Sequence, residues 1–183
     1  MWADENPHAT VESNFQLCFS VNVWCAVLDD QLIGPLILEG HLTGEAYLQF
    51  LHEELPRLLE DVHLNKRGCM YFQHDKAPPH FSCEVRNFLN YRFLGRWIGR
   101  GGPRNWPARS PDLSPLDYCV WGWMKELVYS VKVGTRDALL GRILDAADRI
   151  RHRQRKLQRA TRAVHNRAAA SVAAGGSIFE NQL

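Results

Sequence analysis

The chain has 183 residues, of which 45% are hydrophobic and 23% are charged, and its formal net charge is +2. This length and apolar content predict a globular domain with a buried core and exclude a largely disordered chain. No apolar run is long enough to cross a membrane, and residues 1–6 lack the profile of a secretory signal. The five cysteines are odd in number and form no Cys-x-x-Cys pair, which argues against a disulfide framework or a zinc clip.

The N-terminal third predicts a β-hairpin followed by a helix. Residues 15–28 alternate between apolar and polar side chains and become apolar on both faces from Trp24, as in a strand that enters a core. A turn then leads to a second strand over 32–38, which Pro35 places at a sheet edge because proline donates no ladder hydrogen bond. Thr43 opens a helix that reaches about Val62 and that Pro56 kinks or restarts.

The middle of the chain predicts one short strand and two helices. The short apolar run 69–74 is typical of a buried strand, and the prolines at 78 and 79 end it. A helix is expected over 81–89, and a second one over 116–128 with Pro115 in its first turn. Residues 95–112 predict an irregular, ordered connection. This order of elements indicates an α/β or α+β domain.

Basic residues are concentrated near the C-terminus. Eight of the 22 lysines and arginines lie between Arg149 and Arg167, where there is no acid, and the other 14 accompany 20 acidic residues. Apolar residues from Ile143 to Ala168 recur at spacings of three and four, which predicts one long helix from Asp137 to about Ala170. Two interpretations stay open for it: a solvated face with a self-association seam, or contact with DNA phosphates.

Chemistry is indicated first at Asp75, in the stretch Gln73–His80. An aspartate that directly follows a buried strand is held rigidly at the sheet end, as a metal ligand requires, and the following prolines fix it. A simpler interpretation is an Asx turn that ends the strand.

The second motif surrounds Asp117, in the stretch Arg109–Tyr118. Asp112 or Ser114 is suited to cap the helix that begins near Pro115, and an acid in a first helical turn is favoured by the helix dipole. Capping alone accounts for one of the two aspartates, and the other is free to face a divalent cation.

These two motifs belong to a longer collinear pattern. Its stretches are W-A-D-E-N-P-H-A-T (2–10), S-V-N-V-W (20–24), L-I-G-P (32–35), F-Q-H-D-K-A-P-P-H-F-S (72–82), G-R-W-I-G-R-G-G-P (95–103), S-P-D-L-S-P-L-D-Y (110–118), W-G-W-M-K (121–125) and the terminal G-G-S-I-F-E. With them the chain resembles, over essentially its whole length, the mariner/Tc-like DDE/D transposases, which are DDE superfamily endonucleases of transposable elements.

The resemblance implies a ribonuclease-H-like catalytic domain: a mixed five-stranded sheet flanked by helices. In this family three carboxylates hold two divalent ions, Mg²⁺ or Mn²⁺, which activate a water and then a DNA 3′ hydroxyl for attack on phosphate. Asp75 matches the second catalytic aspartate and Asp117 the third, whereas Asp112 belongs to the S-P-D-L loop and takes the capping role. Between Asp75 and Asp117 lie 41 residues, more than is usual in mariner proper.

Two parts of the family pattern find no match: the N-terminal helix-turn-helix region, and the first strand with the first catalytic aspartate. We therefore expect an α/β fold, a ribonuclease-H-like mixed sheet lacking its first, central strand, with weak or absent metal binding. Residues 1–133 would form this truncated catalytic domain and residues 134–183 a C-terminal helical basic segment. Either the hairpin closes against the strand 69–74, or the edges of both stay unpaired.

Further candidate residues follow from the motifs and the basic helix. Positioning roles are predicted for His74 and His80, because the prolines between them break the geometry of a helical metal site. The stretch 99–102 resembles a phosphate-binding loop only superficially and favours a flexible hinge. Contacts with the DNA backbone are expected from Arg100, Arg104, Arg109, Arg151, Arg153, Arg155 and Lys156.

The leading functional hypothesis is a catalytically inactive remnant of a transposase that still binds DNA nonspecifically. We expect it to reside in the nucleus, to bind no membrane and to be able to form a homodimer. The alternative is a host-used, non-enzymatic DNA-binding or interaction protein that acts through the arginine-rich helix. A third hypothesis is a functional nuclease in which another acid completes the metal site.

Overall fold

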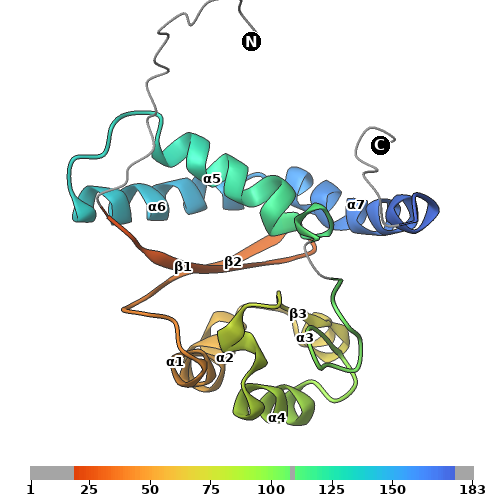
Figure 1. The fold of residues 1–183 in the computed structure, drawn as a ribbon. Helices are drawn as coiled ribbons and strands as arrows, with labels where there is room; N and C mark the ends of the chain where they lie inside the picture. The colour runs from red at the N-terminus through yellow and green to blue at the C-terminus, as the bar shows by residue number, and fades with distance from the viewer. Residues whose placement is uncertain (1–18, 108–109, 176–183) are drawn as a thin grey trace, which may run out of the picture.

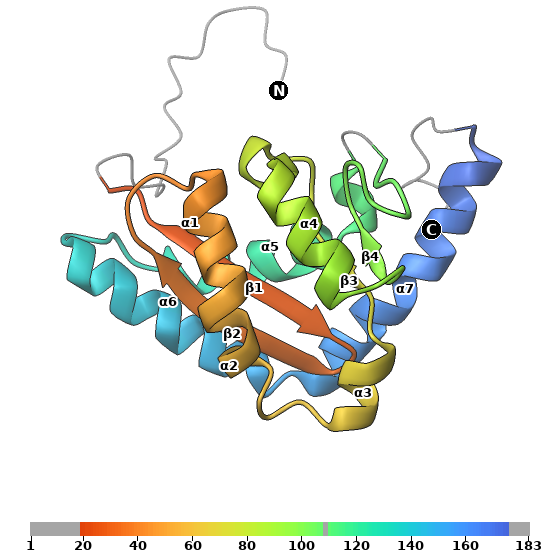
Figure 2. The ribbon, with the colours of Figure 1, turned by 90° about the horizontal axis from the view of Figure 1, so that it is seen from below.

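The computed structural model describes residues 19–107 and 110–175. The elements are β1 (Asn22–Leu28), β2 (Gln31–Leu38), α1 (Gly44–Gln49), the π-helical η1 (Phe50–Glu54), α2 (Leu55–Leu58), α3 (Leu64–Cys69), β3 (Phe72–Gln73), the 3₁₀ turn η2 (Pro78–Phe81), α4 (Cys83–Arg92), β4 (Trp97–Ile98), the 3₁₀ turn η3 (Pro111–Leu113), the π-helical η4 (Leu116–Val120), α5 (Trp121–Val128), α6 (Arg136–Arg151) and α7 (Gln154–Ala173). The β1–β2 hairpin forms a middle layer with α5–α7 on one face and α1–α4 on the other (Figure 1). In the turned view α1 and α2 lie over the hairpin (Figure 2).

The predicted hairpin is present, and a bulge in β2 decides which side chains face which layer. Trp24 pairs with Leu36 and Ala26 with Ile33, so the two residues Gly34 and Pro35 lie opposite the single residue between them in β1. The extra residue reverses the alternation of side chains along β2. Gly34 has a φ of +84°, and a Cβ there would approach the Trp24 carbonyl oxygen to 2.9 Å, so the bulge depends on glycine.

Two apolar clusters cover the two faces of the hairpin. Cys25 and Leu32 point into the cluster with α5, α6 and α7, whereas Trp24 and Ile33 belong to the cluster with α1, α4 and β3. The prediction that β1 becomes apolar on both faces is thereby confirmed. The strand itself begins at Asn22, and the predicted residues 15–18 lie outside the described ones.

The helix predicted after residue 43 is present in three pieces. The Thr43 hydroxyl accepts a hydrogen bond from the Ala46 N–H and begins α1, as predicted. The π-helical η1 then widens the turn directly before Pro56, and α2 continues with this proline in its first turn. A wider turn removes the clash that a proline ring makes with the carbonyl four residues earlier in an α-helix. The predicted restart of the helix at Pro56 is therefore observed as a π segment followed by α2.

The strand predicted at 69–74 is reduced to β3, which pairs in parallel with β4. The helix α3 precedes it, and its last residue, Cys69, was predicted to be the first of the strand. Within the described residues, β1–β2 and β3–β4 are separate two-stranded sheets. Among the described residues the hairpin therefore does not pair with β3, so the first of the two expected arrangements is not seen there.

The prediction of a single C-terminal helix from Asp137 to about Ala170 was wrong, since the chain turns between α6 and α7 at His152 and Arg153. Arg153 has a φ of −91° and a ψ of +39°, outside helical values. The turn lets both helices pack on the hairpin, and Ile150 and Leu157 on either side of it are completely buried. These seam residues therefore lie in the core of this chain. None of the described helices has the length and apolar character of a membrane span.

Candidate catalytic and nucleic-acid-binding sites

Asp75 lies just past β3, separated from Gln73 by His74, and its carboxylate is held by two hydrogen bonds. The Ala77 N–H donates to Oδ1 over 2.9 Å, and His80 Nδ1 donates to the same oxygen over 2.6 Å. The hydrogen bond from His80 lowers the pKa of the Asp75 carboxyl below its ordinary value against the effect of burial, and the Ala77 N–H adds to this shift. The Asx-turn interpretation is thus confirmed, and the Asp75 side chain is 67% exposed.

His74 lies beneath Asp75 and is almost fully buried. Its Nδ1 shares a hydrogen bond of 3.3 Å with the Tyr47 hydroxyl, and its ring stacks on that of His80 at 4.9 Å between centroids. Burial, with a smaller contribution from the charge of His80, lowers the pKa of His74 to about 3, although Asp75 opposes the shift. His74 is therefore neutral at physiological pH and serves as a buried support for the ring that holds Asp75.

Tyr47 was missed as a site residue by sequence reasoning, which placed it only among the apolar positions of a helix. It is 1% exposed, and its ring lies 4.2 Å from the His80 ring between centroids. Burial raises the pKa of its hydroxyl. A tyrosine at a core position, whose hydroxyl needs a partner, was the signal in the sequence.

Asp117 occupies the first turn of η4, and Ser114 is its cap. The Ser114 hydroxyl accepts a hydrogen bond from the Asp117 N–H over 3.4 Å. The capping role predicted for Asp112 was wrong: in the described structure its backbone carbonyl accepts a hydrogen bond from Arg167 Nε, and its side chain caps nothing. The exposed Asp117 carboxylate has no hydrogen bond or ion pair with the described residues.

The described residues contain no group of three or more histidines, cysteines, aspartates or glutamates placed to hold a metal ion. Asp75 and Asp117 are not joined by any hydrogen bond or shared partner among those residues. Because Mg²⁺ and Mn²⁺ require several oxygen ligands, this donor set does not fit a two-metal centre, and no reaction step is derived through one.

The arginines predicted around residues 95–109 lie on aromatic rings. The Arg100 guanidinium is 4.0 Å from the centre of the Phe81 ring, and that of Arg104 is 4.7 Å from the centre of the Tyr71 ring. Arg109 lies outside the described residues. At Gly99 an added Cβ would come within 2.5 Å of His74 Nε2, so this glycine permits close packing, and the prediction of a freely flexible hinge is wrong at this position.

The basic residues of α6 and α7 fall into two groups. Arg151 donates to the Gly34 carbonyl and forms an ion pair of 3.5 Å with Asp148, while Arg153 and Lys156 lie over the Trp123 ring at 5.7 and 5.9 Å. These side chains contribute to the packing of the two helices. Arg155 is exposed and has none of these contacts.

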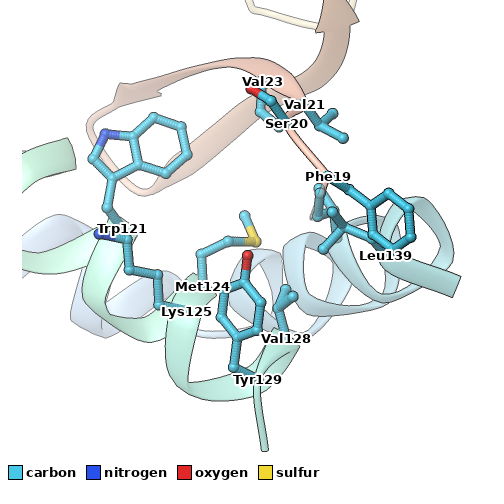
Figure 3. A pocket seen from close by; sticks show the side chains of 11 residues that line it. Phe19, Ser20, Val21, Val23, Trp121, Met124, Lys125, Val128, Tyr129 and Leu139 are labelled. Atoms are coloured by element: carbon cyan, nitrogen blue, oxygen red, sulfur yellow. The ribbon is translucent and has the colours of Figure 1, made fainter. Parts of the chain in front are cut away.

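An apolar hollow of about 410 Å³ lies between the start of β1, α5 and α6. Figure 3 shows Val21, Val23, Met124 and Val128 among the side chains that line it. Among the described residues that line it, Lys125 is the single charged one. None of the candidate catalytic residues borders this hollow, so it is a feature of packing on the α5–α6 side.

Comparison with known proteins gives consistent results. The chain is 27% identical over 111 residues to the transposable element Tc3 transposase of Caenorhabditis elegans, an alignment that covers 61% of this chain and 30% of that protein. The catalytic domain of Mos1 mariner transposase superposes with a TM-score of 0.68 at 19% identity, covering 87% of this chain and 82% of that one. The Mos1 mariner paired end complex with Mn gives a TM-score of 0.70 at 21% identity over 97% of this chain and 51% of the other. No family model matches.

The fold is that of the mariner transposase catalytic domain, a ribonuclease-H-like arrangement of mixed helices and strands. Together with the sequence match to Tc3 transposase, this confirms that the chain is related to the mariner/Tc-like transposases. The chain spans less than a third of the length of that curated relative.

Proposed function

We propose that this chain is a remnant of a mariner/Tc-like transposase catalytic domain that binds nucleic acid and does not cleave it. Its relationship to Tc3 transposase and its fold support the origin. One observation carries the binding activity: residues 149–167 contain eight basic and no acidic residues, and Arg155, Arg159 and Arg162 point to solvent without an ion pair among the described residues. Such a surface attracts the phosphate backbone irrespective of base sequence.

The proposed loss of cleavage rests on the geometry at the two aspartates. Oδ1 of Asp75 already accepts hydrogen bonds from Ala77 and His80, and Asp117 stands alone in the first turn of η4. Two separate carboxylates hold hard dications weakly, because such ions dehydrate only when several oxygens replace their water. A DNA strand at this surface would therefore meet no activated water.

A plasmid-nicking assay tests the lack of cleavage. Supercoiled plasmid is incubated with the chain and with Asp75→Asn in Mg²⁺ or Mn²⁺. We expect equal, background rates of nicking for the two proteins. Nicking that requires the metal and is lost in both Asp75→Asn and Asp117→Asn would overturn the proposal and establish a nuclease.

Fluorescence anisotropy with labelled duplexes of two unrelated sequences tests the binding. We expect equal affinities for both duplexes and a logarithm of the association constant that falls linearly with the logarithm of salt concentration, by about 0.9 for each phosphate contacted. Absence of binding at low salt would contradict the proposal, as would a strong preference for one sequence.

Two further parts of the proposal concern the strands of the sheet and the location of the protein in the cell. We propose that a central strand is lacking between β1 and β3. In support, these two strands belong to separate sheets in the described residues. Their free edges should then exchange backbone amide hydrogens quickly, and slow exchange along both edges would contradict it. Nuclear residence is also proposed, and a fluorescent fusion excluded from the nucleus would contradict it.

A further inference from the structure

A groove of about 500 Å³ runs between α7 and the π-helical η4. Tyr118 and Cys119 line one wall. The other wall consists of side chains from successive turns of α7, namely Lys156, Arg159, Arg162 and Asn166. No candidate assigned from the sequence, other than Lys156, belongs to this groove.

The two walls are fixed to each other by packing and hydrogen bonds. The Tyr118 hydroxyl donates to the Ala160 carbonyl over 2.6 Å, and the Arg167 guanidinium lies 4.3 Å from the centre of the Tyr118 ring. Leu157 and Ala160 anchor the inner face of α7 in the core. The groove is therefore formed before a ligand arrives, which reduces the entropy lost on binding.

The charge of the groove is positive and largely uncompensated. Lys156, Arg159 and Arg162 are exposed, and none of them forms an ion pair within the described residues. Two acids lie nearby: Asp117 precedes the tyrosine of the opposite wall, and Asp29, whose carboxyl pKa is lowered chiefly by its hydrogen bond with Lys66, also interacts with Arg162. Three cations against these two carboxylates, one of them already paired, leave the groove suited to an anion.

The spacing of the cations suits a repeated anion. The three cationic positions are three residues apart, which places successive ones ~4.5 Å further along the helix axis. Guanidinium groups bind phosphate oxygens through two parallel hydrogen bonds, and the Asn166 amide can donate one more. A single small anion would use one of these positions, whereas a phosphodiester chain can use all of them.

We infer that this groove holds the phosphodiester backbone of a nucleic acid, with Arg159 and Arg162 as its main contacts. The inference rests on the proposed function and locates it, moving the contact from the arginines that pack at the α6–α7 turn to the outer turns of α7. Tyr118 and Ala160 position the groove without touching the phosphates.

A pair of charge-matched double variants tests the contacts. Arg159→Gln/Arg162→Gln removes two groove cations, and Arg92→Gln/Arg136→Gln removes two exposed arginines from the end of α4 and the start of α6. We expect the groove variant to bind a labelled duplex at least ~10-fold more weakly and to lower the salt slope by about 2, since each lost phosphate contact lowers it by about 1. The control should stay within about 2-fold. Equal losses in the two variants would overturn the groove.

Alkylation of cysteines gives a second, local readout. Cys119 lines the groove, whereas Cys69 and Cys83 are exposed on the α1–α4 side. With saturating duplex, iodoacetamide should modify Cys119 several-fold more slowly and the other two at unchanged rates, as followed by peptide mass spectrometry. DNA binding that leaves the Cys119 rate unchanged overturns the groove but keeps the proposed function, and failure of the unaltered chain to bind overturns both.

Discussion

The two faces of the hairpin carry different parts of the chemistry. On the α1–α4 side, Asp75 is held by His80, which rests on the buried His74 and Tyr47. On the α5–α7 side, the exposed groups are the cations of α7, fixed to the body through Tyr118. The first region holds one carboxylate in place through three buried or half-buried rings, and the second presents a row of exposed cations on one helix. Placing one carboxylate thus takes contacts from several elements of the chain, whereas a basic surface is built from the exposed residues of a single helix.

The largest expected effect concerns the cores that carry these two regions. Leu157→Ala on α7 and Leu51→Ala in η1 each remove a completely buried side chain, so each should lower the free energy of unfolding by about 2–5 kcal/mol. Urea denaturation measures the loss. Leu144→Ala, at a side chain that is 52% exposed, is the control and should change stability by less than about 0.5 kcal/mol. A small loss in only one of the two clusters would show that the two sides are unequally packed.

The second effect is a pH dependence that arises at His74, on the α1–α4 side. The pKa of His74 is about 3 in the folded chain against an ordinary 6.5. Below about pH 6.5 the unfolded chain gains a proton on His74 that the folded chain does not, so the free energy of unfolding falls as the pH decreases, by up to ~1.4 kcal/mol per unit. Asp75, with its lowered pKa, adds a loss only below its ordinary 3.8.

Urea denaturation between about pH 7 and pH 4 measures this slope. His74→Phe should reduce the change of the free energy of unfolding with pH. The control, His165→Phe at an exposed position, should show the same change as the unaltered chain. A His74→Phe protein with an unchanged slope would show that another group causes the acid sensitivity.

A third, smaller effect tests the support beneath Asp75. Gly99→Ala adds a Cβ within 2.5 Å of His74 Nε2 and should cost about 1–3 kcal/mol as the imidazole is forced to move. Gly122→Ala, where a Cβ meets nothing within 4 Å, is the matched control. The control lies in α5 and should not lose stability, because alanine favours a helix more than glycine does. A Gly99→Ala protein that also keeps its stability would mean that the 99–104 turn shifts to make room for the Cβ.

The smallest expected effect compares helix caps on the two sides. The Ser82 hydroxyl accepts from the Val85 N–H at the start of α4, and the Thr135 hydroxyl accepts from the Ala138 N–H at the start of α6. Ser82→Ala and Thr135→Ala should each lower the free energy of unfolding by about 0.5–2 kcal/mol in thermal or urea denaturation. A loss in one variant only would indicate that the other helix is held by its packing.

Local patterns predicted much of the fold. The alternation from Trp24 onward, the edge position of Pro35 and the helix start at Thr43 each depend on neighbours in sequence, and each was confirmed. The turn at His152 and Arg153 is imposed by packing on the hairpin. It could not be predicted, because neither residue is a glycine or a proline. The parallel pair of β3 and β4 has two residues in each strand, too few for any periodicity.

In the candidate site, too, contacts between residues close in sequence could be predicted and contacts between distant residues could not. Asp75 and His80 lie five residues apart, and the Asx turn between them could be inferred from the prolines. The role of Tyr47 could not, because the residues it joins are 27 or more positions away in sequence. The relation between Asp75 and Asp117 likewise depends on tertiary structure, which spacing alone does not determine.

The hydrogen bond from Tyr118 to Ala160 joins the neighbour of Asp117 to the middle of α7. A ligand that displaces α7 would therefore also displace η4, through this hydrogen bond. Asp117 is thus coupled directly to any movement of α7, whereas Asp75, between β3 and η2, belongs to the other side of the hairpin.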